Sequence, residues 1–193
     1  MDTPEDLEAL EIALLTEGVH RRYGLDYRNY AYASLRRRVW NAVRAEGLET
    51  VTSLLDRVLR DAEAMERLTL ELTVNVTAMF RDPTFYASLR ERVVPLLRSH
   101  PFVRVWHVGC STGEEVYSTA IMLEEEGLYE RARLYATDVN EAVLQTARKG
   151  IFPLNVMAEY GRNYAAAGGR TALTDYYRTG YDYAIMRQSL RRN

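Results

Sequence analysis

Two glycines and two acids follow one another near the middle of the sequence. Residues 109–113 read Gly-Cys-Ser-Thr-Gly, and Glu114 and Glu115 come directly after them. A glycine turn between a strand and a helix commonly receives a phosphate, because its backbone N–H groups can approach the ligand closely. Here the spacing is G-x-x-x-G, which matches neither the dinucleotide fingerprint nor the P-loop. Two acids would also repel a phosphate, so the pattern favours a ligand that carries positive charge.

S-adenosylmethionine (SAM) carries an ammonium and a sulfonium and has no phosphate. Its amino-acid end can lie against the backbone of Gly109 and Gly113 while Glu114 or Glu115 takes the ammonium. In a parallel α/β fold, an acid at the end of the second strand can hold the ribose hydroxyls. Asp138, in the stretch Tyr-Ala-Thr-Asp, stands where that acid belongs. The residues are therefore compatible with a SAM site at this edge of the sheet.

The same acids have a structural alternative. Ser111 and Thr112 each precede a glutamate by three residues, as in a capping box, and Asp138 stands in the same way before Glu141. Acids in the first turn of a helix also suit the helix dipole. Spacing alone therefore leaves both interpretations open.

The elements that must position these residues begin near Pro101. Residues 102–108 and 132–138 are short apolar runs typical of buried strands, and residues 114–127 and 140–150 read as helices. Alternation of strand and helix predicts a parallel sheet with crossover helices, the opening of a Rossmann-like fold. After Asp138 we expect one helix and one hairpin, over residues 176–186, with a tight turn at Thr179-Gly180.

The first hundred residues predict helices. The first helix carries Leu7, Leu10, Leu14 and Leu15 on one face and ends at Gly18. Three more follow over residues 32–47, 50–60 and 61–73, the last two capped by Thr50 and Asp61. A helix from Pro83 should kink or break at Pro95. We expect a helical domain over 1–72, a linker and connecting helix over 73–100, and a partial SAM-binding domain over 101–193 with a hairpin near 175–190.

Composition narrows the class of protein. The chain has 193 residues, is 47% hydrophobic and carries a net charge of −2, which argues against general nucleic-acid binding. Cys110 is the one cysteine, so an internal disulfide is impossible and a reducing compartment fits. There is no signal-peptide pattern and no apolar run of the roughly 18 residues that a membrane span needs. We expect a cytoplasmic protein without membrane insertion. The histidines, His20, His100 and His107, lack metal-ligand spacing, and His107 fits a core position.

The sequence resembles the chemotaxis receptor methyltransferase (CheR) family along essentially its whole length. The resemblance rests on Asn75-x-Thr77-x-x-x-Arg81 in the linker, on the run Gly-Cys-Ser-Thr-Gly-Glu-Glu from Gly109, and on the stretches over 134–152 and 175–193. It implies a class I SAM-dependent methyltransferase with an all-helical N-terminal domain and a small β-subdomain. It also implies methyl transfer from SAM to glutamate side chains of chemoreceptors, with S-adenosylhomocysteine as product and no metal.

The resemblance assigns roles to individual residues. Asn75, Thr77 and Arg81 would line the SAM pocket from the linker. Gly109, Gly113 and one of Glu114 and Glu115, with Glu115 preferred, would hold the methionine part, and Asp138 the ribose. Met79 stands where the family has phenylalanine, a swap of similar volume.

The expected acceptor is a carboxylate on the helix bundle of a receptor's cytoplasmic part. Because a glutamate is already ionised at neutral pH, the reaction needs alignment rather than a base, and Arg81 is the candidate for holding the acceptor. Arg36, Arg37, Arg38 and Arg44 form a basic helix that could lie along an acidic bundle, or simply face solvent. The glycine-rich insertion of members that tether to a receptor's C-terminal pentapeptide is absent, so tethering is not expected.

Family members continue with further strands beyond the motifs found here, so we expect an incomplete sheet. Two alternatives to a chemoreceptor glutamate methyltransferase remain open. The chain could be a binding module for SAM or a receptor that does not catalyse, or a class I methyltransferase with another acceptor.

Overall fold

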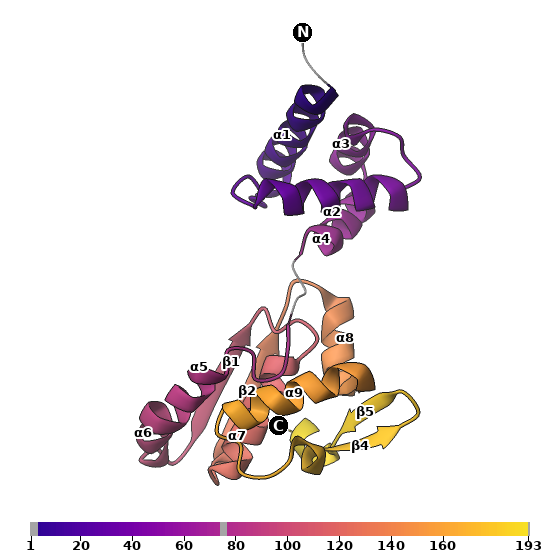
Figure 1. Cartoon of the computed structure of the whole chain (residues 1–193). Helices are drawn as coiled ribbons and strands as arrows, with labels where there is room; N and C mark the ends of the chain where they lie inside the picture. The colour runs from indigo at the N-terminus through magenta and orange to yellow at the C-terminus, as the bar shows by residue number, and fades with distance from the viewer. Residues whose placement is uncertain (1–3, 74–76, 193) are drawn as a thin grey trace. The chain divides into compact units, whose positions relative to one another are not determined.

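The computed structural model describes residues 4–73 and 77–192, and the chain divides into two compact units, Met1–Val74 and Asn75–Asn193 (Figure 1). Within residues 4–73 every regular element is a helix, as the sequence predicted. These are α1 (Pro4–Tyr23), α2 (Tyr32–Ala45), α3 (Val51–Arg60) and α4 (Ala62–Leu72). Among the helices of both described ranges, none has the length and apolar character that crossing a bilayer requires.

The caps predicted for α3 and α4 are confirmed. The Thr50 side chain accepts a hydrogen bond from the Ser53 backbone N–H, and Asp61 accepts from two N–H groups of the first turn of α4. Each cap satisfies donors that a helix N-terminus would otherwise leave unpaired. The apolar stripes of α2 and α4 are buried as their spacing predicted, with Val39 and Leu68 among the most enclosed side chains.

The prediction for α1 was wrong in two respects. Leu7, Leu10 and Leu14 are exposed, because the helix buries a second apolar stripe that includes Ile12 and Leu15. A leucine-rich helix with apolar residues on two faces does not reveal from spacing alone which face is buried. Gly18 does not end the helix, which continues to Tyr23. A Cβ at Gly18 would lie 2.9 Å from Leu55 Cδ1, so this glycine allows α3 to approach α1 closely.

In the second unit, the predicted parallel sheet is present. Strand β1 (Val103–Val108) pairs with β2 (Ala132–Thr137) in parallel, and α7 (Glu114–Glu125) connects them, with a 3₁₀ turn η2 (Tyr129–Arg131) before β2. Helix α8 (Glu141–Lys149) follows. Among the described residues these two strands form the whole parallel sheet. Side chains alternate between a covered face that includes His107 and Leu134 and an exposed face that includes Trp106 and Tyr135.

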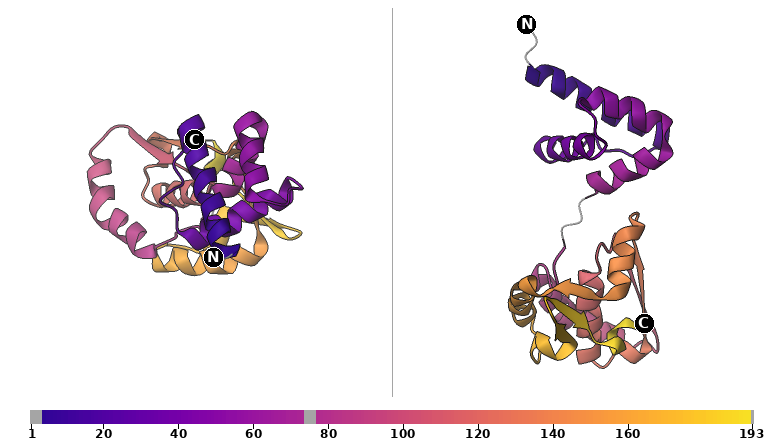
Figure 2. Two further views of the ribbon diagram at one scale, coloured as in Figure 1. Left: turned by 90° about the horizontal axis from the view of Figure 1, so that it is seen from above. Right: turned by 90° about the vertical axis from the view of Figure 1, so that its right-hand side faces the viewer.

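The chain after α8 holds more structure than the sequence predicted. Strand β3 (Ile151–Pro153) and helix α9 (Leu154–Ala166) precede the 3₁₀ turn η3 (Leu173–Tyr176), the hairpin of β4 (Tyr177–Gly180) and β5 (Tyr183–Met186), and η4 (Gln188–Arg191). Strand β5 lies between β3 and β4 in an antiparallel sheet, and α9 packs against it (Figure 2). The expectation of one helix after Asp138 was therefore wrong, because a three-residue strand and a helix without a side-chain N-cap leave little sequence signal.

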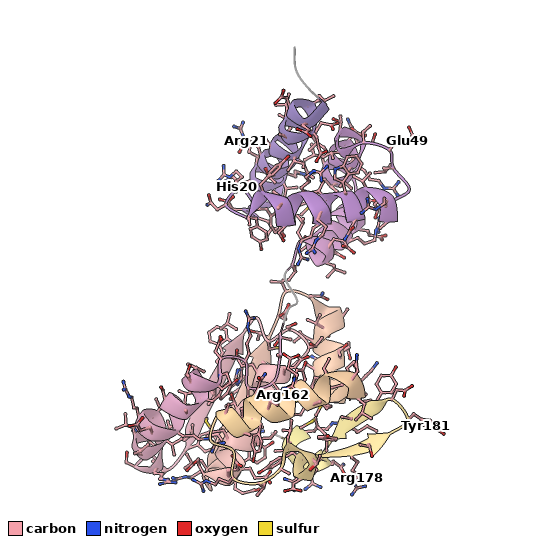
Figure 3. The ribbon with its side chains drawn as sticks, in the orientation of Figure 1. His20, Arg21, Glu49, Arg162, Arg178 and Tyr181 are labelled. Carbon is pink, nitrogen blue, oxygen red and sulfur yellow. The ribbon has the colours of Figure 1, made fainter. Side chains whose placement is uncertain are left out.

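The hairpin turn lies two residues later than predicted. Thr179 and Gly180 belong to β4, where they pair with Ala184 and Tyr183. The loop consists of Tyr181 and Asp182, and Tyr181 has a left-handed φ of 50° and stands at the exposed tip (Figure 3). Glycine was the stronger turn signal, but the strand register places Gly180 at the end of β4, just before the turn.

Pro95 interrupts the helix that starts at Pro83, as predicted. Helix α5 (Pro83–Ser88) widens into a π-helical segment, η1 (Leu89–Val93), before α6 (Val94–Arg98). Proline has no N–H to donate to the preceding turn, and here the Val94 N–H donates to the Leu89 carbonyl, five residues back.

The π-helical segment carries Arg90, the centre of a buried ion cluster. Its guanidinium pairs with Glu125 and Glu126 at the end of α7 and donates to the Ala167 carbonyl after α9. Burial acts to raise the pKa of Glu125, but hydrogen bonds from the Tyr164 hydroxyl and from a backbone N–H, together with Arg90, outweigh it and lower that pKa below its usual 4.5. The cluster therefore ties three helical segments of this unit together.

We predict that Arg90→Met lowers the free energy of unfolding by about 3 kcal/mol, because it removes the guanidinium that the buried carboxylates of Glu125 and Glu126 share. Arg148→Met, which breaks an exposed pair with Glu141, should change it by less than about 1 kcal/mol. Because the folded pKa of Glu125 is lowered, its stabilisation is present above pH 4.5 and is lost as the pH falls through the folded value. Urea unfolding at neutral pH measures both variants, and equal losses would contradict the role of the cluster.

Candidate functional site

The turn between β1 and α7 is a tight loop whose backbone is tied to the end of β2. Gly109, Ser111 and Gly113 all have left-handed φ angles, of 76°, 50° and 97°. The N–H groups of Gly109 and Cys110 both donate to the Thr137 carbonyl, at 2.8 and 2.9 Å. Ser111 is not a glycine, so its conformation costs roughly 1–3 kcal/mol. The surrounding structure therefore holds this loop in an unfavourable backbone shape.

Asp138, the residue after β2, also holds the glycine loop through a hydrogen bond. One of its carboxylate oxygens accepts from the Ser111 N–H at 2.8 Å, and the other accepts from the Asn140 N–H at 2.9 Å. The capping-box alternative for Asp138 is not observed, because the N-cap of α8 is Asn140. A carboxylate offers about four lone-pair positions, so Asp138 retains capacity to accept ribose hydroxyls.

The two glutamates after the loop have different environments. Glu114 is buried, and its carboxylate accepts from the Thr112 hydroxyl at 2.6 Å and from the Tyr160 hydroxyl of α9 at 3.4 Å. Glu115 is largely exposed, and it contacts the Nδ1 atom of His107 at 2.7 Å. The capping boxes suggested for Ser111 and Thr112 do not form, because Gly113 is the N-cap and no side chain caps α7.

The carboxylates of Asp138, Glu114 and Glu115 raise the pKa of neighbouring acidic groups. The pKa of the Cys110 thiol is raised, first by burial and then by Asp138, Glu115 and Glu114, each of which disfavours a thiolate. Burial and Glu114 likewise raise the pKa of the Tyr160 hydroxyl. The region at the carboxyl ends of β1 and β2 is therefore electronegative, which disfavours a phosphate and suits a cationic ligand.

The linker motif, residues 75–81, is described from Thr77 onward, and hydrogen bonds connect this part to the first turns of α7. The Phe80 N–H donates to the fully buried Ser118 hydroxyl at 2.9 Å, and that hydroxyl donates to the Glu114 carbonyl at 2.6 Å. Asn163 of α9 donates to the Met79 carbonyl at 3.2 Å, and the Met79 side chain is fully buried.

Phe80 and Asp82, on either side of Arg81, have left-handed φ angles of 51° and 56°. Three of the four non-glycine residues with positive φ in the described chain thus lie in the linker or the glycine loop. The structure places Thr77 half-buried and Arg81 exposed in this segment, and Asn75 lies outside the described residues.

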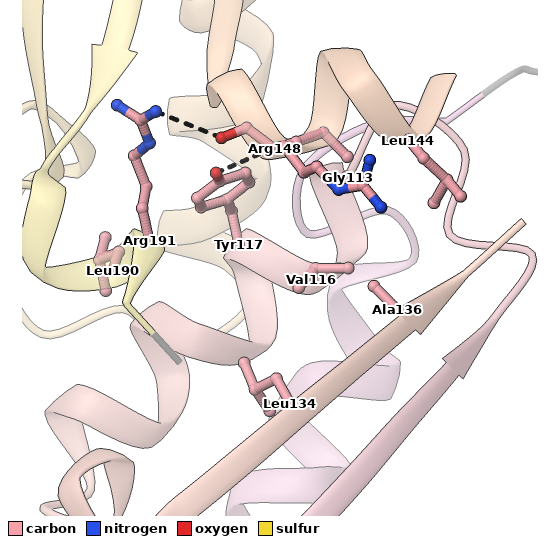
Figure 4. Close-up of a pocket in the computed structure, with 10 residues that line it drawn as sticks. Gly113, Val116, Tyr117, Leu134, Ala136, Leu144, Arg148, Leu190 and Arg191 are labelled. Carbon is pink, nitrogen blue, oxygen red and sulfur yellow. Dashed lines mark hydrogen bonds between the residues drawn. The ribbon is translucent and has the colours of Figure 1, made fainter. Parts of the chain in front are cut away.

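A separate pocket of about 250 Å³ lies between α7, α8 and η4 (Figure 4). In it the Tyr117 hydroxyl donates to the Ala147 carbonyl, and Arg191 donates to the Arg148 carbonyl. It shares Gly113 with the predicted site, but no acid lines it. This pocket therefore lacks the groups that a ribose or an ammonium would need.

The four arginines of α2 do not form one free surface. Arg38 donates to the Glu71 and Thr73 carbonyls, where it satisfies the C-terminus of α4, and Arg36 pairs with Glu8 of α1. At 100° per residue, Arg37 and Arg44 lie on the side of α2 opposite its buried residues. These two are exposed and present charge to solvent, although Arg44 also contacts Asn41.

Sequence reasoning missed the groups that hold the site together. It placed His107 in the core, which its burial confirms, but it did not predict the contact with Glu115. Ser118, Tyr160 and Asn163 carry no motif that could have revealed their contacts, because each is brought in by packing between helices.

A glycine turn lies after the first parallel strand, an acid lies after the second, and acids stand in place of phosphate-binding groups, an arrangement that fits a class I SAM-dependent methyltransferase. Comparison with known proteins agrees. The family description "CheR methyltransferase, SAM binding domain" matches residues 75–173, and "CheR methyltransferase, all-alpha domain" matches residues 10–73. The chain belongs to the CheR methyltransferase family.

Among its relatives is a Pseudomonas putida protein named "Putative methyltransferase Cher3", a name that states no acceptor. It is 48% identical over 191 residues, which cover 99% of this chain and 70% of the relative. The chemotaxis protein methyltransferase of Listeria innocua is 29% identical over 208 residues, covering 96% and 79%. That of Salmonella typhimurium is 32% identical over 142 residues, covering 71% and 48%.

The two loop glycines should differ sharply when replaced by alanine. Both have a left-handed φ, which costs roughly 1–2 kcal/mol for an alanine. A Cβ at Gly109 would meet nothing within 4 Å, whereas one at Gly113 would lie 2.9 Å from Ala147 Cβ and 3.1 Å from its Cα. We expect Gly113→Ala to cost about 3 kcal/mol and Gly109→Ala about 1 kcal/mol in chemical denaturation. Equal costs would contradict the packing role of Gly113.

Proposed function

We propose that this chain transfers the methyl group of SAM to a glutamate carboxylate of a chemoreceptor and so forms a methyl ester. The observation that carries the proposal is the position of Asp138, whose carboxylate is bonded to the glycine loop at the carboxyl ends of β1 and β2. Ligands of parallel α/β folds bind at this edge. The absence of a phosphate motif and the electronegative surroundings support SAM over a nucleotide phosphate.

The residues have the following proposed roles. The Asp138 carboxylate accepts hydrogen bonds from the ribose hydroxyls. The backbone at Gly109 faces the methionine part, since the space beside its Cα is open: a Cβ there would meet nothing within 4 Å. Glu115 takes the ammonium, because its exposed carboxylate is available, whereas Glu114 is buried against Thr112 and Tyr160. Asn75, Thr77 and Arg81 complete the site from the linker.

SAM supplies the methyl group and a sulfonium leaving group. The acceptor glutamate is already ionised at neutral pH, so no residue of this chain has to remove a proton. One carboxylate oxygen of the acceptor attacks the methyl carbon, the carbon–sulfur bond breaks, and its electron pair stays on the sulfur of S-adenosylhomocysteine. The task of the chain is to align the carboxylate with that bond, and Arg81 can hold the non-attacking oxygen.

We also propose that the N-terminal unit recognises the receptor. Arg37 and Arg44 are the arginines of α2 that the structure leaves for an acidic helix bundle, since Arg36 and Arg38 are engaged by Glu8 and α4. The proposal keeps the predicted domains, which are a helical domain over 1–72, a linker and connecting helix over 73–100 and a SAM-binding region over 101–193. It also keeps the predicted cytoplasmic location.

A second candidate function rests on one observation. The parallel sheet has two strands among the described residues, and neither strand has a partner on its other edge there. A chain with this sheet could bind SAM or a receptor without catalysing transfer. SAM binding without methyl transfer, measured on the same preparation, would support this candidate over the first.

Asp138→Ala should weaken SAM binding by roughly 1–3 kcal/mol in calorimetry, because hydrogen bonds to a charged group are lost. The variant also removes the acceptor of the Ser111 N–H, so thermal unfolding should accompany the measurement. Glu141→Ala is the matched control, since it removes a nearby exposed acid without a proposed ligand contact. Equal affinity in wild type and Asp138→Ala would refute the ribose assignment.

Arg81→Ala should lower methyl transfer to a receptor by at least about tenfold while changing SAM affinity much less, because Arg81 is assigned to the acceptor. Arg178→Ala, at an exposed position on β4, is the control (Figure 3). Unchanged turnover would remove Arg81 from the mechanism. The transferred label should be released by mild base as expected for an ester, and a base-stable product would indicate another acceptor.

A further inference from the structure

His107 lies next to last in β1, on the covered face of the sheet. Its side chain is 4% exposed, and its Nδ1 atom lies 2.7 Å from Glu115 Oε1. Its Nε2 atom is buried and has no hydrogen-bond partner among the described residues. The imidazole therefore makes one directed hydrogen bond, and that bond is to the first turn of α7.

The direction of this hydrogen bond follows from the partner. An ionised carboxylate only accepts hydrogen bonds, so Nδ1 carries the proton and donates it to Glu115. A buried ring cannot turn freely, whereas an exposed glutamate otherwise samples several rotamers and loses that freedom on binding a ligand. The imidazole thus fixes one oxygen of Glu115 in a single place and leaves the second oxygen available.

Glu115 also acts electrostatically on other parts of the candidate site. Its charge contributes to raising the pKa of the Cys110 thiol in the glycine loop. It also contributes, after burial, to raising the pKa of Tyr86 in α5 to about 12. The charge of Glu115 is therefore felt both in the loop after β1 and in the helix that follows the linker motif.

We propose that His107 is a positioning residue that holds Glu115 ready to accept the ammonium group of SAM. The inference rests on the proposed function and deepens it. It explains how Glu115, held by His107, makes this site selective for ligands with an amino-acid end. His107 does not touch the ligand in this account. It acts by orienting the carboxylate that does.

The test is a double-mutant cycle on the full chain, with S-adenosylhomocysteine affinity measured by calorimetry. His107→Leu should weaken binding about tenfold, the loss expected when one hydrogen bond to a charged group is removed. His107→Asn should restore most of the affinity, because its side-chain N–H can take the place of Nδ1. In a Glu115→Gln background, His107→Leu should change affinity by less than twofold, since the oriented charge is already gone.

A second ligand separates positioning from damage to the fold. 5′-Methylthioadenosine contains the adenosine and sulfur but no amino-acid end, so His107→Leu should bind it as wild type does. Equal weakening of both ligands, or the same loss in the Glu115→Gln background, would overturn the inference. If wild type and His107→Leu bind S-adenosylhomocysteine equally, the inference fails while the proposed function stands. If wild type does not bind S-adenosylhomocysteine, the proposed function itself fails.

Discussion

The hydrogen bond between the Asp138 carboxylate and the Ser111 N–H joins the two halves of the site. It connects the loop after β1 to the residue after β2, and the Thr137 carbonyl reinforces it by accepting from two further N–H groups of that loop. Parallel strands end at the same edge of a sheet, so one acid can stabilise a strained turn and face a ligand at once. The loop keeps its strained backbone because neighbouring strands and helices hold both of its ends.

The first turns of α7 are the second organising centre. Ser118 connects the linker motif to the helix backbone, Tyr160 reaches Glu114 from α9, and His107 reaches Glu115 from β1. Carboxylates at a helix N-terminus are stabilised by the helix dipole, so Glu114 and Glu115 cost the fold little stability. In the proposed function, their combined charge selects the ligand, because it repels phosphate and attracts an ammonium.

The sequence predicted the positions of the glycine loop and of Asp138 in the fold better than the elements that follow them. Asp138 and the glycine loop could be placed because the alternation of strand, turn and helix in the sequence shows where each element ends. Thr50 and Asp61 mark helix starts because their side chains cap the first turn, which depends on local contacts alone. Spacing could not choose between the two leucine faces of α1, nor could it reveal β3 and α9. The contact of His107 with Glu115 spans a strand, a loop and a helix, and only the fold brings such residues together.

A crystal structure of the full chain with S-adenosylhomocysteine would test the central claim most directly. The account predicts the ribose hydroxyls within hydrogen-bond distance of the Asp138 carboxylate, and the ammonium beside Glu115. A ligand bound instead in the acid-free pocket between α7, α8 and η4 would contradict it, as would a ribose held without Asp138.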